Sequence, residues 1–430
     1  MLLFYLLSTP LSCGVNMPEY KIHIAQHQHY SCLLCGRCCR RFHVRLDKAE
    51  CLRLANLDWQ GEPNPHDFTV TINGHEYFKR NADGGCVFLD EKGACRMHAK
   101  FGFDVKALTC RGYPMNIVST FPGELSVLAR MDCPAVLKDY GTPLSEQRKD
   151  IEKLVSEMKF GKPFTESQLC GLERKTIETI RDAVASLLED YTAPLPNRIR
   201  AALALLDACQ KLSAPFLNDH ETMQEVWKNF KTKYKPSDTI PQTPGLSAYS
   251  RIVYRTWLAA YCRRDEEILD RSFFSRLKLF KRNLMFILGH GNWHELGWEH
   301  PDYPFAKAAV FKRASQKTEY HDESWAPFMR FLQTRLECFQ FFGVSYYGTD
   351  FFSGLRALLK TYAHTLVTAR YHAAANGRGI ITEDDVFQAV LSIDHCHGRS
   401  PSLNFRSSRS NENYFSGKRF DSLLADLGWA

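Results

Sequence analysis

Long hydrophobic runs are missing from this 430-residue sequence. No segment offers the roughly eighteen consecutive apolar residues that a membrane-spanning helix requires, and we therefore expect no membrane partner. Neither sign of charge dominates, because the formal net charge is only +7. An excess of this size gives no reason to expect nucleic acid as a partner. Internal repeats are absent as well, which excludes a repeat architecture.

The length and composition are those of a globular protein with more than one domain. A chain of 430 residues is long for a single core, and its 44% apolar and 24% charged residues are ordinary for a globular fold. Residues 1–19 form an apolar extension without the charged start of a secretory signal. We interpret Met17 as the true start of translation; the alternative, a lipoprotein cleavage site before Cys13, is disfavoured by Pro10.

Cysteine, in contrast, is abundant: nine of the fifteen cysteines lie between Cys32 and Cys133, and the densest stretch reads Cys32-Leu-Leu-Cys35-Gly-Arg-Cys38-Cys39. Disulfides fit this pattern poorly, because cysteines that are adjacent or three residues apart are badly placed to bridge each other. The chain is also much longer than the small secreted scaffolds that depend on disulfides. We therefore interpret these cysteines as metal thiolates and expect a reducing, cytoplasmic compartment.

Eight of these cysteines form the predicted metal site. On a helix, Cys32, Cys35 and Cys38 would share one face and converge on one ion or cluster. On the same helix Cys39 would be rotated by about 100° from Cys38. Either Cys39 binds at a second metal site, or one of these two cysteines supports the first site without binding the metal directly. Two four-thiolate sites, or one filled site with spare thiols, remain open. The predicted ligands are Cys32, Cys35, Cys38, Cys39, Cys86, Cys95, Cys110 and Cys133. Cys51 follows the apolar pattern of its helix and is interpreted as a buried small residue.

The spacing favours an iron–sulfur cluster, with zinc as the alternative. Four-sulfur sites suit both. Zinc ribbons use two widely separated Cys-x2-Cys pairs, whereas three thiols crowded in one segment with the others scattered are closer to ferredoxin-type ligation. Radical enzymes that cleave S-adenosylmethionine space three cysteines by four and three residues, and Cys32, Cys35 and Cys38 are spaced by three and three.

The chain is predicted to have an α+β fold that is mostly α. Residues 20–142 are predicted to form a small, irregular, cysteine-rich metal-binding domain. Its hydrophobic core would be small, so bound metal would supply part of its stability. Within it, Asn73-Gly74 between two alternating segments predicts a β-hairpin over 68–78. The other elements expected there are a strand at 40–46, a helix capped by Asp47 that runs to Ala55, a turn at 90–93 and a strand at 125–130.

Residues 143–430 are predicted to form a larger all-helical region. Apolar residues at three-and-four spacing predict helices at 173–189, 197–212, 248–262, 265–287, 326–342, 350–375 and 382–393, the last with Thr382 as its N-cap. The proline-rich residues 234–247 are predicted to be a linker. Residues 398–417, rich in Ser, Arg and Asn, are predicted to be an exposed or mobile loop.

These cysteines resemble the CxxCxxCC family of zinc- or iron-chelating domains. The resemblance covers residues 28–140, about a quarter of the chain, and rests on the first block and on Cys86-Val-Phe-Leu89, Cys95, Cys110-Arg-Gly-Tyr-Pro114 and Asp132-Cys133-Pro134. Within this family the chain is similar in layout to the flagellin lysine-N-methylases, which also carry a long helical C-terminal region. That likeness implies methyl transfer from S-adenosylmethionine to a lysine of flagellin or of another protein. The alternative is a non-enzymatic zinc or iron–sulfur protein with a structural or redox-sensing centre and a helical part that binds a partner.

No catalytic residue can be named from the sequence. The glycine-rich strand–turn–helix of Rossmann-type methyltransferases is missing, and residues 374–379, the nearest match, are typical of a plain helix C-cap. A methyl-donor site would therefore be formed by helices or between the domains. The basic residues beside the cysteines either offset thiolate charge or are merely solvated; they are Arg37, Arg40, Arg41, His43 and Arg45.

Three further segments have a simple interpretation and a functional one. Residues 290–295 and 394–397 contain histidines that mimic metal ligands, but a loop and a helix C-terminus explain them more simply. The aromatic residues of 341–352 would line a channel for a lysine side chain, with Asp350 accepting its charge, or would pack helix against helix. We favour the packing interpretation.

Overall fold

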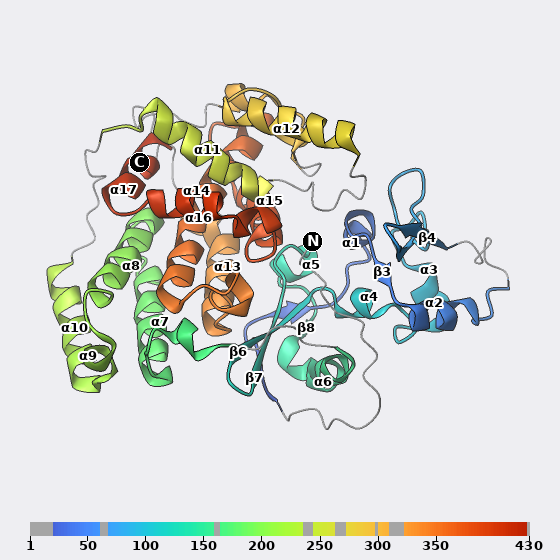
Figure 1. Ribbon diagram of the computed structural model, residues 1–430, viewed down its shortest axis with the longest axis horizontal. Helices are drawn as coiled ribbons and strands as arrows, with labels where there is room; N and C mark the ends of the chain where they lie inside the picture. The colour runs from blue at the N-terminus through green and yellow to red at the C-terminus, as the bar shows by residue number, and fades with distance from the viewer. Residues whose placement is uncertain are drawn as a thin grey trace.

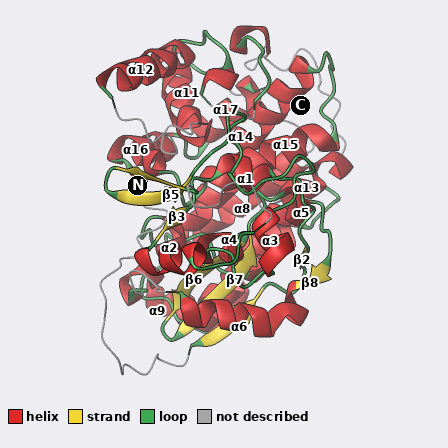
Figure 2. Ribbon diagram, turned by 90° about the vertical axis from the view of Figure 1, so that its right-hand side faces the viewer, coloured by secondary structure: helices red, strands yellow, loops and turns green. Residues whose placement is uncertain are grey.

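The computed structural model describes residues 20–60, 68–158, 164–234, 244–262, 272–296, 300–308 and 322–427. The fold is α+β and mostly helical, as predicted, and every strand of the described residues lies before Leu144. Figures 1 and 2 show the strands gathered in one half of the molecule, while the other half consists of helices.

The strands form three small sheets. In the first, β1 (Lys21–Ile24) runs parallel to β7 (Glu124–Ala129), which pairs antiparallel with β6 (Met115–Phe121). The second joins β2 (His29–Tyr30) to β8 (Thr142–Pro143). The third has the order β3 (Arg45–Leu46), β5 (His75–Phe78), β4 (Thr69–Ile72), all antiparallel. The strand predicted at 125–130 is confirmed as β7.

Two predictions from local sequence patterns in the cysteine-rich part, a hairpin and a helix cap, are confirmed, and one, a strand, is wrong in part. The predicted hairpin is β4–β5, with Asn73 and Gly74 at φ 52° and 76°. Asp47 caps α2 (Lys48–Ala55) in a reciprocal capping box. The strand predicted at 40–46 is wrong in its first half, because α1 (Arg37–Arg41) occupies it and only β3 is extended. The other helices of this part are α3 (Arg96–Phe101) and α4 (Leu108–Gly112).

The helical half is built from longer elements (Figure 1). Helix α5 (Pro134–Leu137) still belongs to residues 20–142, and α6 (Arg148–Glu157) follows it beside the first sheet. The further helices are α7 (Arg174–Leu188), α8 (Leu195–Cys209), α9 (Ala214–Asn218), α10 (His220–Lys233), α11 (Ala248–Cys262), α12 (Phe273–Ile287), α13 (Ala326–Glu337), α14 (Phe351–Ala375), α15 (Glu383–Cys396), α16 (Arg406–Tyr414) and α17 (Lys418–Asp426). Short 3-10 turns are η2 (Leu144–Gln147), η3 (Glu166–Leu169), η5 (Trp293–Glu295), η6 (Phe305–Ala308), η7 (Asp322–Trp325), η8 (Val344–Tyr346) and η9 (Pro401–Asn404).

The predicted helices of this half are confirmed within the described residues, with shifted ends. The loop predicted at 398–417 is wrong, since η9 and α16 occupy it. The polar composition of this segment misled the prediction, because one of its polar residues, Glu412, is buried and hydrogen-bonded to the rest of the helical half. The Glu412 carboxylate accepts a hydrogen bond from the Tyr346 hydroxyl at 2.8 Å, and the Glu412 backbone carbonyl accepts one from Lys360 at 3.0 Å. The N-terminal extension and most of the predicted linker at 234–247 lie outside the described residues.

Two separate hydrophobic cores result. The larger one joins the helices to the first sheet, including Ile24 and Val127. Its centre is α14, whose residues from Phe351 to Ala373 are almost all buried. The smaller one lies within the cysteine-rich part and consists of Val44, Leu46, Leu54, Trp59, Phe68, Phe78, Phe88, Met97 and Ala107. The domain boundary at residue 142 stays a prediction. None of the helices in the described ranges combines the length and the apolar character that a bilayer span requires.

Candidate metal centre

The first cysteine block is not one helix. Cys32 and Cys35 are exposed and lie in an irregular segment, and helix α1 begins only at Arg37. Leu34 and Gly36 both have positive φ, at 53° and 65°, which turns the chain before the helix starts. The prediction that three cysteines share one helical face is therefore wrong, because backbone turns in the left-handed region break the periodicity on which it depended.

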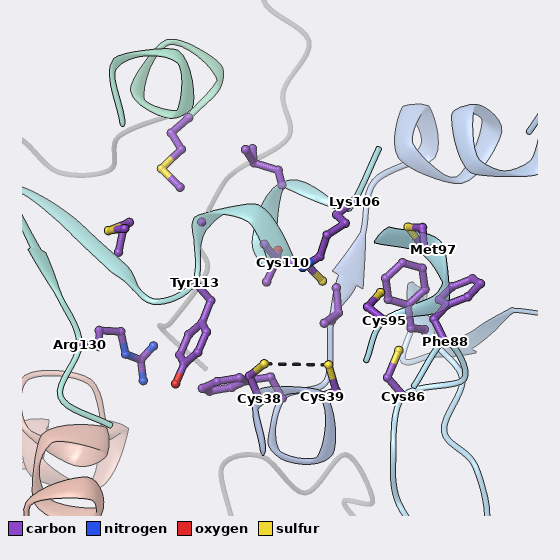
Figure 3. A pocket seen from close by; sticks show the side chains of 18 residues that line it. Cys38, Cys39, Cys86, Phe88, Cys95, Met97, Lys106, Cys110, Tyr113 and Arg130 are labelled. Atoms are coloured by element: carbon purple, nitrogen blue, oxygen red, sulfur yellow. Dashed lines mark hydrogen bonds between the residues drawn. The ribbon is translucent and has the colours of Figure 1, made fainter. Parts of the chain in front are cut away.

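Five of the eight predicted ligands line one cavity of about 110 Å³ (Figure 3). Adjacent Cys38 and Cys39 enter it from α1, and Cys110 enters from α4. Cys86 and Cys95 come from two short bridges, Arg80 with Cys86 and Leu89 with Cys95. The rest of the wall is mostly apolar and aromatic, with Phe42, Val44, Phe78, Phe88, Met97, Leu108, Tyr113, Met115 and Met158 among its residues.

Within this cavity Cys38 and Cys39 lie beside different neighbours, although their sulfurs are hydrogen-bonded to each other. Figure 3 shows Cys39 on the side of Cys86, Cys95 and Cys110, and Cys38 on the side of Tyr113. The peptide N–H of Cys86 donates to the carbonyl of Cys39 at 3.0 Å, which ties these two segments together. We call Cys39, Cys86, Cys95 and Cys110 the inner set.

The other four predicted ligands share an electrostatic effect on one residue, Tyr30, and one of them, Cys38, also lines the cavity. Burial raises the pKa of this tyrosine, and negative charge on the nearby thiols raises it further; those thiols belong to Cys32, Cys133, Cys38 and Cys35. Charge on Cys35 likewise raises the pKa of Cys133. We call Cys32, Cys35, Cys38 and Cys133 the outer set. The two sets meet at Cys38 and Cys39, whose sulfurs are 3.9 Å apart.

Gly93 holds the two parts of the cysteine-rich region close together. It has a φ of 84°, and a Cβ at this position would lie 2.5 Å from the carbonyl oxygen of Leu34. The turn predicted at 90–93, just before Cys95, therefore packs directly on the backbone beside Cys35. No residue other than glycine fits this contact without moving one of the two chains.

Cys39 is the thiol of the cavity that ionises most easily. The hydrogen bond between the Cys38 and Cys39 sulfurs lowers the pKa of Cys39 to about 7, although burial acts in the opposite direction; Lys106 adds positive charge nearby. The same hydrogen bond, together with burial, raises the pKa of Cys38 well above its usual range. Thiolate is the form that binds a metal, so among the predicted ligands that line the cavity Cys39 is the closest to that form.

Burial raises the pKa of four other thiols. It raises the pKa of Cys86 to about 12 and that of Cys133 to about 11, and it also raises the pKa values of Cys95 and Cys110. A metal must displace these protons when it binds, and its affinity therefore depends on pH.

The donor set fits a thiolate-bound metal. None of the eight predicted ligands forms a disulfide, and soft sulfur donors select zinc or iron–sulfur clusters over magnesium and calcium. In the part of the chain that the structure describes, no three Cys, His, Asp or Glu side chains are close enough together to hold an ion as they stand. To bind a metal, the sulfurs of either set would have to move closer together, since zinc–sulfur bonds are only about 2.3 Å long.

Next to Cys133, the fully buried Asp132 anchors the site. Burial would raise the pKa of this carboxyl group, but Arg130 and Arg41 hold it well below the usual range. Arg130 binds it through two nitrogens, with Nε at 3.1 Å from Oδ1, and the Arg41 guanidinium is 3.6 Å away. Arg41, predicted as part of a basic patch, is thus a buried counter-ion of Asp132.

The same carboxylate connects the cysteine-rich part to helix α15. Nδ1 of His395 is 3.1 Å from Oδ2 of Asp132. The peptide N–H of Asp132 donates to Asp394 at 3.2 Å, and Asp394 pairs with Arg335 at 2.5 Å. The histidine segment at 394–397 therefore serves an ionic network, and the sequence could not show its partner, which lies more than 260 positions away.

In two other segments, 341–352 and 290–295, the structure agrees with the structural interpretation and not with the functional one. Asp350 caps α14 by accepting the Ser353 peptide N–H at 3.0 Å, and the aromatic run packs in the large core. In 290–295, Nδ1 of His294 is 2.8 Å from the carbonyl of His300. Sequence reasoning missed Lys106 and Tyr30; the only signal for Lys106 was its position four residues before Cys110.

The cysteine-rich segment is similar to a known family of domains. Residues 31–133 match the model of the CxxCxxCC family, described as "Putative zinc- or iron-chelating domain". This quarter of the chain is thus similar to the domains of that family, a likeness that supports metal binding and that the first cysteine block indicated.

One known protein is similar to this chain over about a quarter of its length. An uncharacterized protein of Methanocaldococcus jannaschii is 24% identical over 111 residues, which cover 25% of this chain and 37% of that protein. The match thus spans little more than a third of the relative's length. A search of the solved structures gave no significant match.

Proposed function

We propose that this chain is a thiolate metalloprotein in which the inner and outer sets each bind one metal centre. The observation that supports this most strongly is that all four inner thiols line the cavity, whereas only Cys38 of the outer set does so, and that the four outer thiols act together on Tyr30. Four thiolates complete either a tetrahedral zinc site or an iron–sulfur cluster. The crowded first block favours clusters, with zinc as the alternative.

A structural role for these centres follows from the size of the small core. Nine buried hydrophobic residues make up that core, and a core of this size supplies little stability by itself. Metal–thiolate bonds between α1, α4 and the two bridges would hold these segments together. When bound, a cluster would also supply a one-electron redox couple, which suits a sensing role.

Metal analysis of cysteine variants tests the proposal. Protein purified without oxygen should contain iron and sulfide and be brown, or contain zinc and be colourless. With two centres, Cys110→Ser in the inner set and Cys35→Ser in the outer set should each remove about half of the metal, while Cys209→Ser in α8 should remove none. Complete loss in both variants would show a single shared centre, and full retention in both would contradict the ligand assignment.

The narrower proposal is methyl transfer from S-adenosylmethionine to a protein lysine, with flagellin as the first candidate substrate. Its support is the layout of the chain, together with one feature of the cavity: the aromatic side chains of Phe42, Phe88 and Tyr113 line it beside the cysteines. Aromatic faces attract cations such as the sulfonium of this donor. A neutral lysine amine is already a nucleophile, so positioning and deprotonation suffice for the reaction.

Labelled methyl donor distinguishes this activity from the non-enzymatic alternative. Metal-replete protein should transfer label to flagellin, and Phe88→Leu should weaken donor binding, measured per metal-loaded chain because Phe88 also belongs to the small core. Absence of donor binding by calorimetry, in protein with full metal content, would leave a structural or redox-sensing centre with a partner-binding helical region. In either case a reducing, cytoplasmic setting is part of the proposal, since unpaired thiols persist there.

A further inference from the structure

Helix α12 turns a continuous apolar stripe towards solvent. The members of the stripe follow one another at steps of four, three, four and four residues, which places them on one helical face. Their exposed fractions are 73% for Phe273, 52% for Leu277, 65% for Phe280, 45% for Leu284 and 50% for Leu288. An amphipathic helix of a globular protein normally turns such a face inwards.

The opposite face of α12 already holds the helix on the molecule. Phe286 is only 2% exposed and packs on Trp293 and Phe305, with ring centres 5.6 and 4.7 Å away. Figure 1 shows α12 at the rim of the helical half, beside α11. The exposed stripe is therefore an additional apolar surface and not a badly packed core face.

The charges of this helix all have one sign. Arg276, Lys278 and Lys281 are exposed, and Arg282 lies 3.9 Å from Glu295. No aspartate or glutamate occurs from Phe273 to Leu288. By helical geometry Arg276 lies on one side of the stripe and Lys278 and Lys281 lie on the other, so that an apolar centre is bordered by positive charge.

We propose that α12 docks the protein on the surface of an anionic lipid bilayer. A helix that lies in the interface buries its apolar face among the acyl chains while its basic residues meet the headgroups. The stripe of Phe and Leu side chains with basic edges and no acidic residue matches this requirement, and it matches an uncharged surface poorly. The expectation of no membrane partner depended on the lack of long apolar runs, which an interfacial helix does not need. This proposal is independent of the metal centres.

Vesicle co-sedimentation tests the docking with the full-length, metal-replete protein. Vesicles of phosphatidylcholine and phosphatidylglycerol at three to one should sediment the protein, and pure phosphatidylcholine vesicles should sediment much less. The Leu277→Ser/Phe280→Ser variant should bind anionic vesicles at least about tenfold more weakly, since two large apolar groups no longer enter the bilayer. Lys278→Gln/Lys281→Gln should weaken the binding about tenfold as well, and added salt should weaken the wild type.

Phe216→Ser is the matched control, because Phe216 is 62% exposed but lies on α9; its vesicle binding should equal that of the wild type. Should the Leu277→Ser/Phe280→Ser variant fail to fold, the lysine variant and the salt dependence decide. Unchanged binding in both variants, or equal sedimentation with neutral vesicles, would overturn the proposal. So would a concentration-dependent dimer by light scattering that the apolar variant abolishes while no vesicle is bound, because the stripe would then join two copies of the chain.

Discussion

The two cores of this molecule differ in what holds them together. In the helical half, α14 is enclosed by its neighbours, and its hydrogen-bonded turns are stabilised by packing alone. In the small core of the cysteine-rich part, nine buried hydrophobic residues among those described support strands of two to four residues and helices of five to eight residues, which carry little stability of their own. The thiols are concentrated where apolar burial is scarce. The comparison suggests that one half folds by hydrophobic packing and the other by metal binding.

Removal of the metal should have the largest effect and should separate the two halves. A chelator should unfold the region from α1 to α4, because structural thiolate sites contribute on the order of 10 kcal/mol to folding. Hydrogen exchange should then become fast in residues 37–112 and stay slow in α14. Equal protection of both regions after complete metal removal would show that the small core is stable without its staple.

Loss of the charge on Asp132 should destabilise the contact between the halves. Asp132→Asn leaves the Arg130 and Arg41 guanidinium groups buried without a full counter-charge, which costs about 3–5 kcal/mol in buried ion pairs. Urea unfolding followed by tryptophan fluorescence measures this loss.

Asp139→Asn provides the matched control for that measurement. The Asp139 side chain is 41% exposed and lies 2.9 Å from His29, so its loss should cost less than about 1 kcal/mol. A similar small cost in both variants would mean that the two halves do not depend on the buried network.

The Gly93→Ala variant should act on the site more than on the fold. The added Cβ would meet the Leu34 carbonyl at 2.5 Å and also carry the strain of a positive φ, for which a cost of about 1–3 kcal/mol is typical. Because this contact positions the segment of Cys35, the outer set should lose metal before the inner set does. Metal per chain and the free energy of unfolding are the measurements.

Gly74→Ala isolates the steric part of this effect. Gly74 also has a positive φ, 76°, but nothing lies within 4 Å of its added Cβ. The control should therefore show the backbone strain with no loss of metal. Metal loss of equal size in both variants would assign the effect to general destabilisation of the cysteine-rich part.

The same comparison explains what could be predicted from the sequence. Helices such as α7 and α14 follow from periodic apolar residues, and the β4–β5 hairpin follows from Asn73-Gly74, because these signals are local. The cysteines were also recognised from their spacing. Their division into two sets depends on the left-handed turns at Leu34 and Gly36, and the Asp132–His395 contact depends on packing between distant segments. Neither leaves a local pattern.

The smallest expected effect on stability concerns the helix N-caps, because the same capping motif occurs in both halves. Asp47 caps α2 and Thr382 caps α15, each in a reciprocal capping box. Either change to alanine removes a hydrogen bond from the first helical turn and should cost about 1 kcal/mol. In α15, which is buried on most of its surface, packing keeps the helix in place whether or not metal is bound, so the cost of Thr382→Ala should be the same in both states. In α2, only Leu54 is fully buried, and the cost of Asp47→Ala should fall to nearly zero once the metal is removed, because the helix is then already unfolded. Differential scanning calorimetry of both variants with and without metal measures the contrast, and a metal-independent cost at Asp47 would show that α2 belongs to the part of the molecule that folds by packing.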